Sequence, residues 1–281
     1  MDKISFSAYT KNELSKMSNL KNKQEVYFEF LGYCSSANLV EGAKSFKFST
    51  ENEYNINRFA KLLNNININD YKIEIQGKTY IITAKENLQN FNITEEIASS
   101  ENLKRAYIRG SFLGGGYINN PENKYHLEVV FRNKTYVDSV AQILSEYDIK
   151  YGLLDKGKNT ILYIKDSDEI SKFLALIGAN SAVLKFEETR VMRDMKNNIN
   201  RLVNCETANL NKTINAAVEQ MTVIKKLKKN KKFETLPEDL KELATLREKY
   251  PNATLTELGK KMTKPIGKTS VSNKFKKLKD Y

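Results

Sequence analysis

The chain has 281 residues and a formal net charge of +12, with 40% hydrophobic and 28% charged residues. Length alone favours about two domains, each large enough for its own core. Two cysteines are too few for a disulfide framework or a zinc ligand set, and the single histidine excludes sites that need two imidazoles.

The hydropathy of the chain sets limits on its location. The first 20 residues lack the apolar core of a signal peptide, and no window reaches about 18 consecutive apolar residues. We therefore expect a cytoplasmic protein that neither spans nor contacts a membrane.

The positive charge is concentrated in the last fifth of the chain. Residues 221–281 hold 17 Lys and Arg against seven Asp and Glu, whereas residues 1–181 hold 23 against 22. A basic C-terminal module on a nearly neutral body suggests a nucleic-acid anchor. A solvated lysine surface that serves solubility is the alternative.

Two segments of the body show the same order of expected elements. Each begins with an apolar helix, continues through a strand and a second helix, and ends in a hairpin that turns at a Gly-Lys pair. The Gly77 and Gly157 turns lie 80 residues apart, which predicts an internal duplication of two αββαββ-like repeats. The expected elements are residues 26–33, 46–50, 55–64 and 71–84, then 103–113, 126–131, 135–147 and 151–164.

The first helix of the second repeat ends in a glycine-rich run, IRGSFLGGGYI, at residues 108–118. Gly110 and Gly114 share one helical face, where another backbone can approach closely, and Gly115 and Gly116 end the helix. A phosphate-binding loop is the alternative, but it would need Gly-Lys-Ser/Thr after a strand. The run resembles the helix of the LAGLIDADG homing endonuclease family, which implies a close helix pair followed by hairpins.

The acids that this resemblance implies are missing. Aligned on the glycines, the metal-binding acid of that family falls on Gly115, and residues 30–38 of the first repeat, FLGYCSSAN, contain no Asp or Glu. The family's phosphodiester cleavage resembles a two-metal displacement that needs one carboxylate from each repeat. We predict no catalytic residue, no metal, no cofactor and no nuclease activity.

Three other residues of the body are less favoured candidates for chemistry. Glu29 and Glu128 are nearby acids, but one precedes the helix end and the other lies on a strand. His126, on an alternating strand, is more typical of a packed or surface histidine than of a general base.

Beyond Leu184, apolar residues recur at intervals of three and four, which predicts a sustained helix. Residues 197–212, NNINRLVNCETANLNK, are rich in asparagine, a mediocre helix former. The functional interpretation is a polar face that contacts DNA or a partner, and the asparagine drift of an AT-rich genome is an equal alternative. The candidate contacts of this polar face are Asn200, Arg201, Asn204 and Asn209. Cys205 is expected to be a small packed residue.

The run KKLKKNKK at residues 225–232 predicts a flexible or helical basic linker. Its alternative is a solvated charge run without a partner. Its candidate phosphate contacts are Lys225, Lys226, Lys228 and Lys229.

The last 49 residues show a compact three-helix pattern. Pro237 marks the start of the first helix, a Thr254–Glu257 capping box opens the second, and Thr269 or Ser270 is the expected cap of the third. A short second helix, a tight turn and a basic third helix predict a helix-turn-helix, and an ordinary small helical bundle is the alternative. The outward residues expected to contact DNA are Lys268, Thr269, Ser270, Ser272, Asn273, Lys276 and Lys277.

Nearly the whole chain is similar to one family, the sporulation regulators called WhiA. The resemblance implies a degenerate homing endonuclease domain tethered to a helix-turn-helix, with a role in transcription and in cell division or chromosome segregation. It rests on STEN (49–52), RGSFLGGG (109–116), YHLE (125–128), NRLVNCETAN (200–209), LPEDLKELATLREKYPNATLTELGKKM (236–262) and GKTSVSNKFKKL (267–278).

The sequence therefore predicts an α+β protein with tandem αββαββ LAGLIDADG-like repeats followed by an all-α helix-turn-helix domain. We expect a degenerate body at residues 1–184, with repeats at about 20–95 and 100–184, a helical connector at 185–232 and the helix-turn-helix at 233–281.

The expected function is sequence-specific binding of double-stranded DNA by a non-enzymatic, nucleoid-associated regulator with partners among transcription or division proteins. Two alternatives stay open. One is an adaptor whose body binds a protein or ligand while the basic tail anchors it to DNA. The other is an active nuclease with displaced metal ligands.

Overall fold

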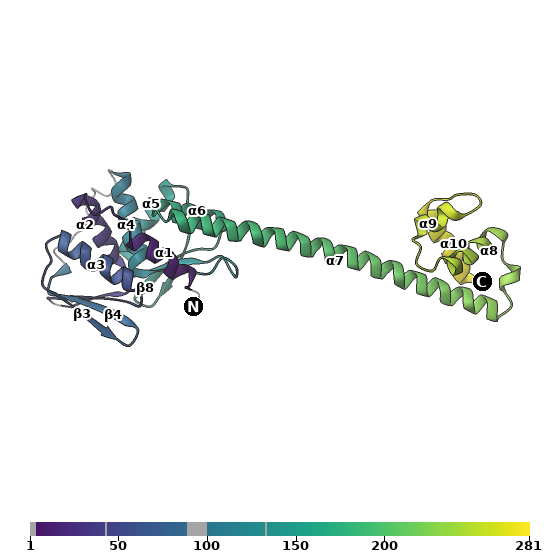
Figure 1. Ribbon diagram of the computed structural model, residues 1–281, viewed down its shortest axis with the longest axis horizontal. Coiled ribbons are helices and arrows are strands. Elements are labelled where there is room, and N and C mark those ends of the chain that lie inside the picture. Colours follow the sequence, from purple (N-terminus) through teal and green to yellow (C-terminus); the bar gives the residue numbers. More distant parts are fainter. Residues whose placement is uncertain (1–3, 43, 89–99, 133) are drawn as a thin grey trace. The chain divides into compact units, whose positions relative to one another are not determined.

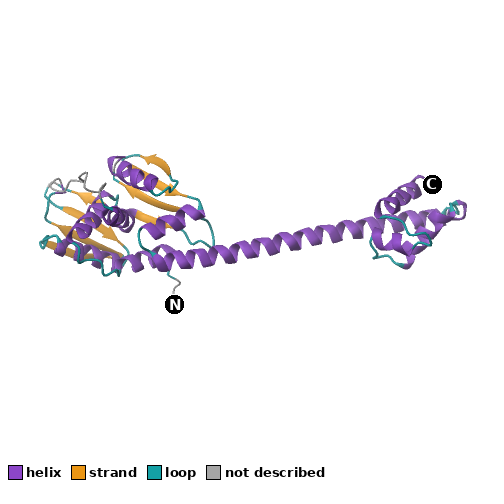
Figure 2. Ribbon diagram, turned by 90° about the horizontal axis from the view of Figure 1, so that it is seen from above, coloured by secondary structure: helices purple, strands orange, loops and turns teal. Residues whose placement is uncertain are grey.

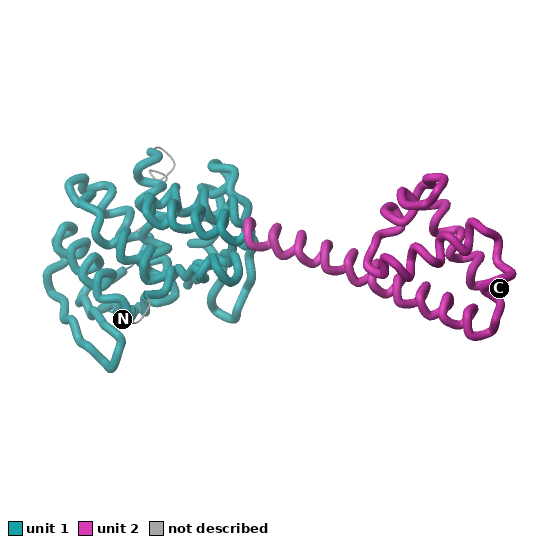
Figure 3. Tube along the Cα trace, turned by 45° about the vertical axis from the view of Figure 1, so that its right-hand side comes forward, with its two compact units in different colours: residues 1–193 teal, residues 194–281 magenta. Residues whose placement is uncertain are grey.

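The computed structural model describes residues 4–42, 44–88, 100–132 and 134–281. The chain divides into two compact units, unit 1 at residues 1–193 and unit 2 at residues 194–281 (Figure 3). The functional boundaries predicted at residues 184 and 232 stay predictions. The expected end of the first repeat, near residue 95, lies outside the described residues.

Unit 1 contains two repeats, each with the element order αββαββ (Figures 1 and 2). The predicted α+β class and tandem repeats are confirmed. The first repeat comprises α2 (Lys23–Ser35), β1 (Leu39–Glu41), β2 (Phe46–Thr50), α3 (Glu53–Asn65), β3 (Tyr71–Gln76) and β4 (Thr79–Ala84). The second comprises α4 (Glu101–Gly115), β5 (Gly116–Ile118), β6 (Leu127–Phe131), α5 (Lys134–Glu146), β7 (Gly152–Lys156) and β8 (Asn159–Ile164).

Each repeat folds its four strands into one antiparallel sheet with the same strand order, β1-β2-β4-β3 and β5-β6-β8-β7. The hairpins turn at Gly77 and Gly157, whose φ values of +62° and +64° lie in the left-handed region that favours glycine. Alternate residues of β6 and β8 are buried, so one face of the second sheet packs on the core. The shared order supports the predicted duplication.

The helices α2 and α4 pack against each other at the centre of unit 1, and glycines make their approach possible. A methyl group on Gly110 would overlap the carbonyl oxygen of Glu29, and one on Gly114 would lie 2.6 Å from the Ser36 hydroxyl oxygen. Gly32 of α2 likewise meets the backbone of Tyr107. The predicted close helix pair is therefore confirmed, and the contact at Gly110 is among its tightest points.

A buried ionic cluster joins α2, α3 and α4 beside this helix pair. The Glu29 carboxylate accepts hydrogen bonds from Arg58 Nε at 2.7 Å and from Arg109 Nε at 2.9 Å, and all three residues are at most 5% exposed. Burial alone would raise the pKa of Glu29, but the two guanidinium groups outweigh it and hold that pKa below its usual value. Glu29 therefore serves as a buried counter-ion.

Three further helices flank the repeats: α1 (Phe6–Ser15), α6 (Ser167–Leu176) and α7 (Asn180–Lys229). The Glu13 carboxylate of α1 accepts hydrogen bonds from the backbone N–H groups of Ser181 at 2.6 Å and Ala182 at 2.8 Å, and so caps the start of α7. α7 confirms the predicted sustained helix. Within the described residues, no helix combines the length and apolarity needed to cross a membrane.

Unit 2 has its own core. Its helices are the C-terminal part of α7, the 3-10 helix η3 (Phe233–Thr235), α8 (Glu238–Lys249), α9 (Leu255–Lys261) and α10 (Lys268–Asp280) (Figure 1). Ile224 and Leu227 of α7 are buried in the same cluster as Leu243, Val271 and Phe275. The end of α7 is therefore part of the fold of unit 2.

Candidate nucleic-acid interface

The helices α8, α9 and α10 form the predicted helix-turn-helix, and a buried arginine holds them in place. Arg247 of α8 is 1% exposed and donates hydrogen bonds from Nε to Gln220 of α7 at 2.9 Å and from Nη1 to the Ala253 carbonyl at 2.6 Å. Its guanidinium also lies 5.5 Å from the ring centroid of Phe275 on α10. One side chain therefore fixes α7, the α8–α9 loop and α10.

The short helix α9 and the turn after it fix the direction of α10. The predicted capping box is confirmed, because Thr254 Oγ1 accepts from Glu257 N and the Glu257 carboxylate accepts from Thr254 N. A methyl group on Gly259 would overlap the carbonyl oxygen of Ile266, so glycine is needed where the turn passes α9. The turn between α9 and α10 therefore packs directly against α9.

The start of α10 differs from the prediction. The helix begins at Lys268 with Gly267 as its N-cap, so the expectation that Thr269 or Ser270 caps it is wrong. Gly267 is the last extended residue, with φ −74° and ψ 162°, and it has no side chain to signal a cap. Thr269 and Ser270 are instead helical and exposed.

The outer face of α10 carries the seven predicted contact residues. Val271, Phe275 and Leu278 face the core, while the predicted residues are exposed or, for Ser272, half-buried. Across the described part of the chain, no protein group forms a side-chain hydrogen bond or ion pair with any of the seven. They are Lys268, Thr269, Ser270, Ser272, Asn273, Lys276 and Lys277.

Two other lysines of α10 are engaged within the protein. Lys274 pairs with Asp239 of α8, and Lys279 donates to Glu219 of α7 at 2.5 Å. The Lys274 ammonium holds the pKa of Asp239 below its usual value through its hydrogen bond. Lys274 and Lys279 of α10 therefore form ion pairs within unit 2, whereas the lysines on its outer face have no carboxylate partner in the described structure.

Residues 225–229 of the basic run are helical and form the end of α7, whereas residues 230–232 lie beyond the helix. Lys225, Lys226 and Lys229 are exposed, and the described residues offer them no ion-pair partner. Lys228 differs, because its ammonium lies 2.7 Å from the Glu248 carboxylate and 4.9 Å from the ring centroid of Phe233. Three of the four candidate lysines therefore keep an uncompensated charge.

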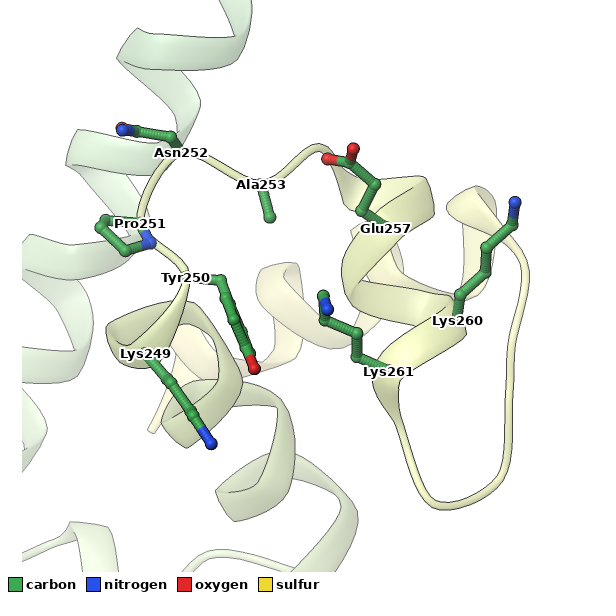
Figure 4. Close-up of a pocket in the computed structure, with 8 residues that line it drawn as sticks. All are labelled: Lys249, Tyr250, Pro251, Asn252, Ala253, Glu257, Lys260 and Lys261. Carbon is green, nitrogen blue, oxygen red and sulfur yellow. The ribbon is translucent and has the colours of Figure 1, made fainter.

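A basic hollow that the sequence reasoning missed lies between the end of α8 and α9. It has a volume of about 590 Å³ and is lined by Lys249, Tyr250, Lys260 and Lys261, with Glu257 at its edge. Figure 4 shows Lys261 reaching toward the ring of Tyr250, 4.3 Å from its centroid, and Lys260 pointing away. The only signal in the sequence was lysine in the last turns of two helices.

The asparagine-rich block lies on an exposed stretch of α7. At about 100° per residue, Asn200, Arg201 and Asn204 project within about a third of the circumference, while Asn209 lies opposite Asn200. The four residues therefore do not form one face. Cys205 is exposed, so the expectation of a packed cysteine is wrong, because this stretch of α7 has no packed side.

In unit 1, the ends of α2 and α4 leave no room for an acid at Gly115. A Cβ atom there would lie 2.5 Å from the Val130 carbonyl oxygen and 3.0 Å from Ser36 Cβ. Among the described residues, no group of three or more His, Cys, Asp and Glu could hold a metal ion. His126, just before β6, has its Nε2 atom 3.1 Å from the carboxylate of Glu128 on β6, so these two residues pair.

Two family comparisons cover most of the chain. The WhiA LAGLIDADG-like domain matches residues 104–196, and the WhiA C-terminal HTH domain matches residues 199–281. The "Probable cell division protein WhiA" of Clostridium tetani is 36% identical and covers 98% of this chain and 96% of its own. The protein of the same name from Clostridium botulinum strain Hall is 42% identical over 67% of this chain and 60% of its own.

Solved structures show the same likeness. The crystal structure of full-length WhiA from Thermatoga maritima superposes with a TM-score of 0.65 at 28% identity, covering 99% of this chain and 97% of that chain. The N-terminal LAGLIDADG domain of a WhiA protein superposes with a TM-score of 0.55 at 25% identity, covering 63% of this chain and 91% of that chain.

Proposed function

This chain belongs to the WhiA family, and from that premise we propose that it is a sequence-specific DNA-binding regulator that does not cleave DNA. The names of its relatives refer to cell division, so we place its regulatory role in division, chromosome segregation or sporulation-type development. Its site of action is the nucleoid in the cytoplasm, and its further partners are transcription or division proteins.

The observation that carries this proposal is the outer face of α10. Lys268, Lys276 and Lys277 offer three positive charges that no acid of the described chain neutralises, and Asn273 offers a free carboxamide on the same helix. Lysines on this face neutralise phosphates and set affinity, while a carboxamide can pair with both edge atoms of an adenine in the major groove. The face therefore combines the two kinds of contact that specific recognition needs.

The end of α7 and the hollow in Figure 4 carry further lysines of unit 2. One set lies at the end of α7 and comprises Lys225, Lys226 and Lys229, and the other lines the hollow and comprises Lys249 and Lys260. We propose that both sets contact the DNA backbone and carry no sequence information. Lys228, already paired with Glu248, contributes least.

Three features of unit 1 support the absence of cleavage. Gly115 stands where the resemblance places a metal-binding acid, and the Val130 carbonyl closes that position. Glu29 is held by two arginines, and Glu128 of β6 is paired with His126. A two-metal displacement needs carboxylates that converge on the cations, and these acids are committed elsewhere.

We propose a division of labour along the chain that follows the predicted boundaries. Residues 233–281 read DNA, residues 185–232 connect and add phosphate contacts, and residues 1–184 form a body that evolved from a nuclease-like fold. For folding, the last turns of α7 belong with the helix-turn-helix, since Ile224 and Leu227 complete its core.

The experiment is selection of bound sites from a random duplex library, followed by incubation of the best site with Mg²⁺ and with Mn²⁺. We expect one enriched motif and intact strands under both ions. The Glu128→Gln variant serves as the control for any nicking. Chelator-sensitive nicking that this variant removes would show an active nuclease, and the absence of any enriched motif would remove sequence specificity.

A further inference from the structure

A polar cavity of about 490 Å³ lies in unit 1, at the ends of the paired helices α2 and α4. Its walls come from α1, from Asn38 just after α2, from the end of β2, from Thr79 at the start of β4, and from Tyr117 on β5. Asn38 fixes the junction, because its Nδ2 donates to the Gly114 carbonyl at 2.8 Å. The cavity is large enough for a small ligand.

The amine of Lys11 on α1 borders this cavity without a partner. Among the described residues, no acceptor forms a hydrogen bond or ion pair with Lys11 Nζ, whose one recorded contact is the ring of Phe112 at 6.0 Å. Burial lowers the pKa of Lys11 to about 8, and no neighbouring carboxylate opposes that effect. Lys11 is half-buried, and its ammonium group has no counter-ion among the described residues, so an anion in the cavity would have a charge to pair with.

The groups around Lys11 are mainly donors. Ser7 and Ala8 belong to the first turn of α1, where the helix dipole is positive, and Lys11 follows Ser7 by one turn on the same face. The hydroxyls of Ser49 and Thr79 border the cavity, and no described protein group bonds to them. Hydroxyl groups of this kind donate readily to an oxyanion.

Glu51 is the one carboxylate that borders the cavity, and it does not serve as the counter-ion of Lys11. Its side chain is exposed to solvent, and it makes no ion pair with Lys11. Asn52 also lines the wall, but its amide is already bonded to Asn12 and to the backbone of Asn55. Two charged residues therefore border the cavity, and of these Lys11 is half-buried whereas Glu51 is exposed.

We propose that this cavity binds a phosphate-type oxyanion, with Lys11 as its counter-ion and the Ser49 and Thr79 hydroxyls as further donors. The oxyanion comes either from a small phosphate-bearing molecule or from the backbone of DNA. In either case unit 1 takes a ligand of its own, separate from the interface on α10.

The test uses the full chain and two lysine variants. Lys11→Met keeps the length of the side chain and removes the charge, and because Lys11 is half-buried and forms no ion pair, the change should leave the fold intact. Lys16→Met is the matched control, because Lys16 follows α1, is exposed and does not line the cavity. Thermal unfolding is measured in inorganic phosphate and in sodium chloride of equal ionic strength.

We expect phosphate to raise the unfolding temperature of the wild type and of Lys16→Met above the value in chloride, since a ligand that binds only the folded state stabilises it. Lys11→Met should lose that difference. Mass-spectrometric mapping of amine labelling gives a second readout, in which phosphate or a 30-base-pair duplex should slow labelling of Lys11 several-fold and leave Lys16 unchanged.

The labelling arms distinguish the two sources of the oxyanion. Protection of Lys11 by phosphate but not by the duplex indicates a small ligand, and protection by the duplex, with or without protection by phosphate, indicates that the site accepts backbone phosphate. If neither probe protects Lys11, or if Lys11→Met gains as much stability in phosphate as the wild type, the cavity is not an oxyanion site and the proposal is wrong.

Discussion

Replacement of Glu29 by glutamine tests the buried cluster that joins the three central helices of unit 1. Glu29→Gln keeps the shape of the side chain but removes the only carboxylate that Arg58 and Arg109 contact in the described structure. Two guanidinium groups then stay buried without a counter-charge. Removing one partner of a buried ion pair costs about 3–5 kcal/mol, so we expect a loss of that size in the free energy of unfolding.

The matched control is Asp70→Asn. Asp70 pairs with Lys85 at 3.3 Å, but both side chains are 69% exposed, so the pair is screened by water. Its loss should cost about 0–1 kcal/mol. Because the chain has no tryptophan, urea unfolding is followed by circular dichroism, and hydrogen exchange in α2 and α4 assigns the transition to unit 1.

The free energy of unfolding should also depend on pH in a definite direction. The folded pKa of Glu29 lies below its usual value, so its contribution is fully present above an unfolded pKa of about 4.3 and is lost as the pH falls through the folded pKa. The difference in the free energy of unfolding between the wild type and Glu29→Gln should therefore be largest near neutral pH and should decrease in acid. An equal cost for Glu29→Gln and Asp70→Asn at neutral pH would refute the account of the cluster.

Three further predictions follow from the packing and charge of the two units. Gly110→Leu should lower the free energy of unfolding by about 1–3 kcal/mol or more, measured in urea, because its side chain would overlap the backbone of α2; an unchanged midpoint would contradict the close contact. In salt-dependent DNA titrations, Lys276→Ala should reduce the salt slope by about 1, whereas Lys274→Ala, already paired with Asp239, should change it less. Fragment 194–281 should show cooperative thermal unfolding and fragment 233–281 should not, because the shorter one lacks the α7 residues of its core.

Much of the fold follows from local patterns in the sequence. The Gly-Lys turns, the alternation in β6 and β8 and the capping box of α9 depend on residues close together in the chain. The strands β1 and β5 were not predicted because three residues are too few to show an alternation. The start of α10 was misplaced because Gly267 caps it without a side chain.

The site was predictable only in part, because exposure follows from helical period but pairing between elements does not. The apolar residues Val271, Phe275 and Leu278 are four and three apart in sequence, so the core side of α10 and the outer side opposite it could be inferred. The ion pair of Lys228 with Glu248 and the isolation of Lys11 depend on contacts between distant segments. No spacing in one sequence reveals them.

The most direct measurement of the central claim is the affinity of Asn273→Ala for a selected site and for a scrambled duplex at several salt concentrations. If Asn273 reads a base, the variant should lose about 1–3 kcal/mol on the selected site and little on the scrambled one. Lys277→Ala is the control, and it should weaken both duplexes alike. An Asn273→Ala variant that loses affinity equally on the two duplexes would contradict sequence recognition by this face of α10.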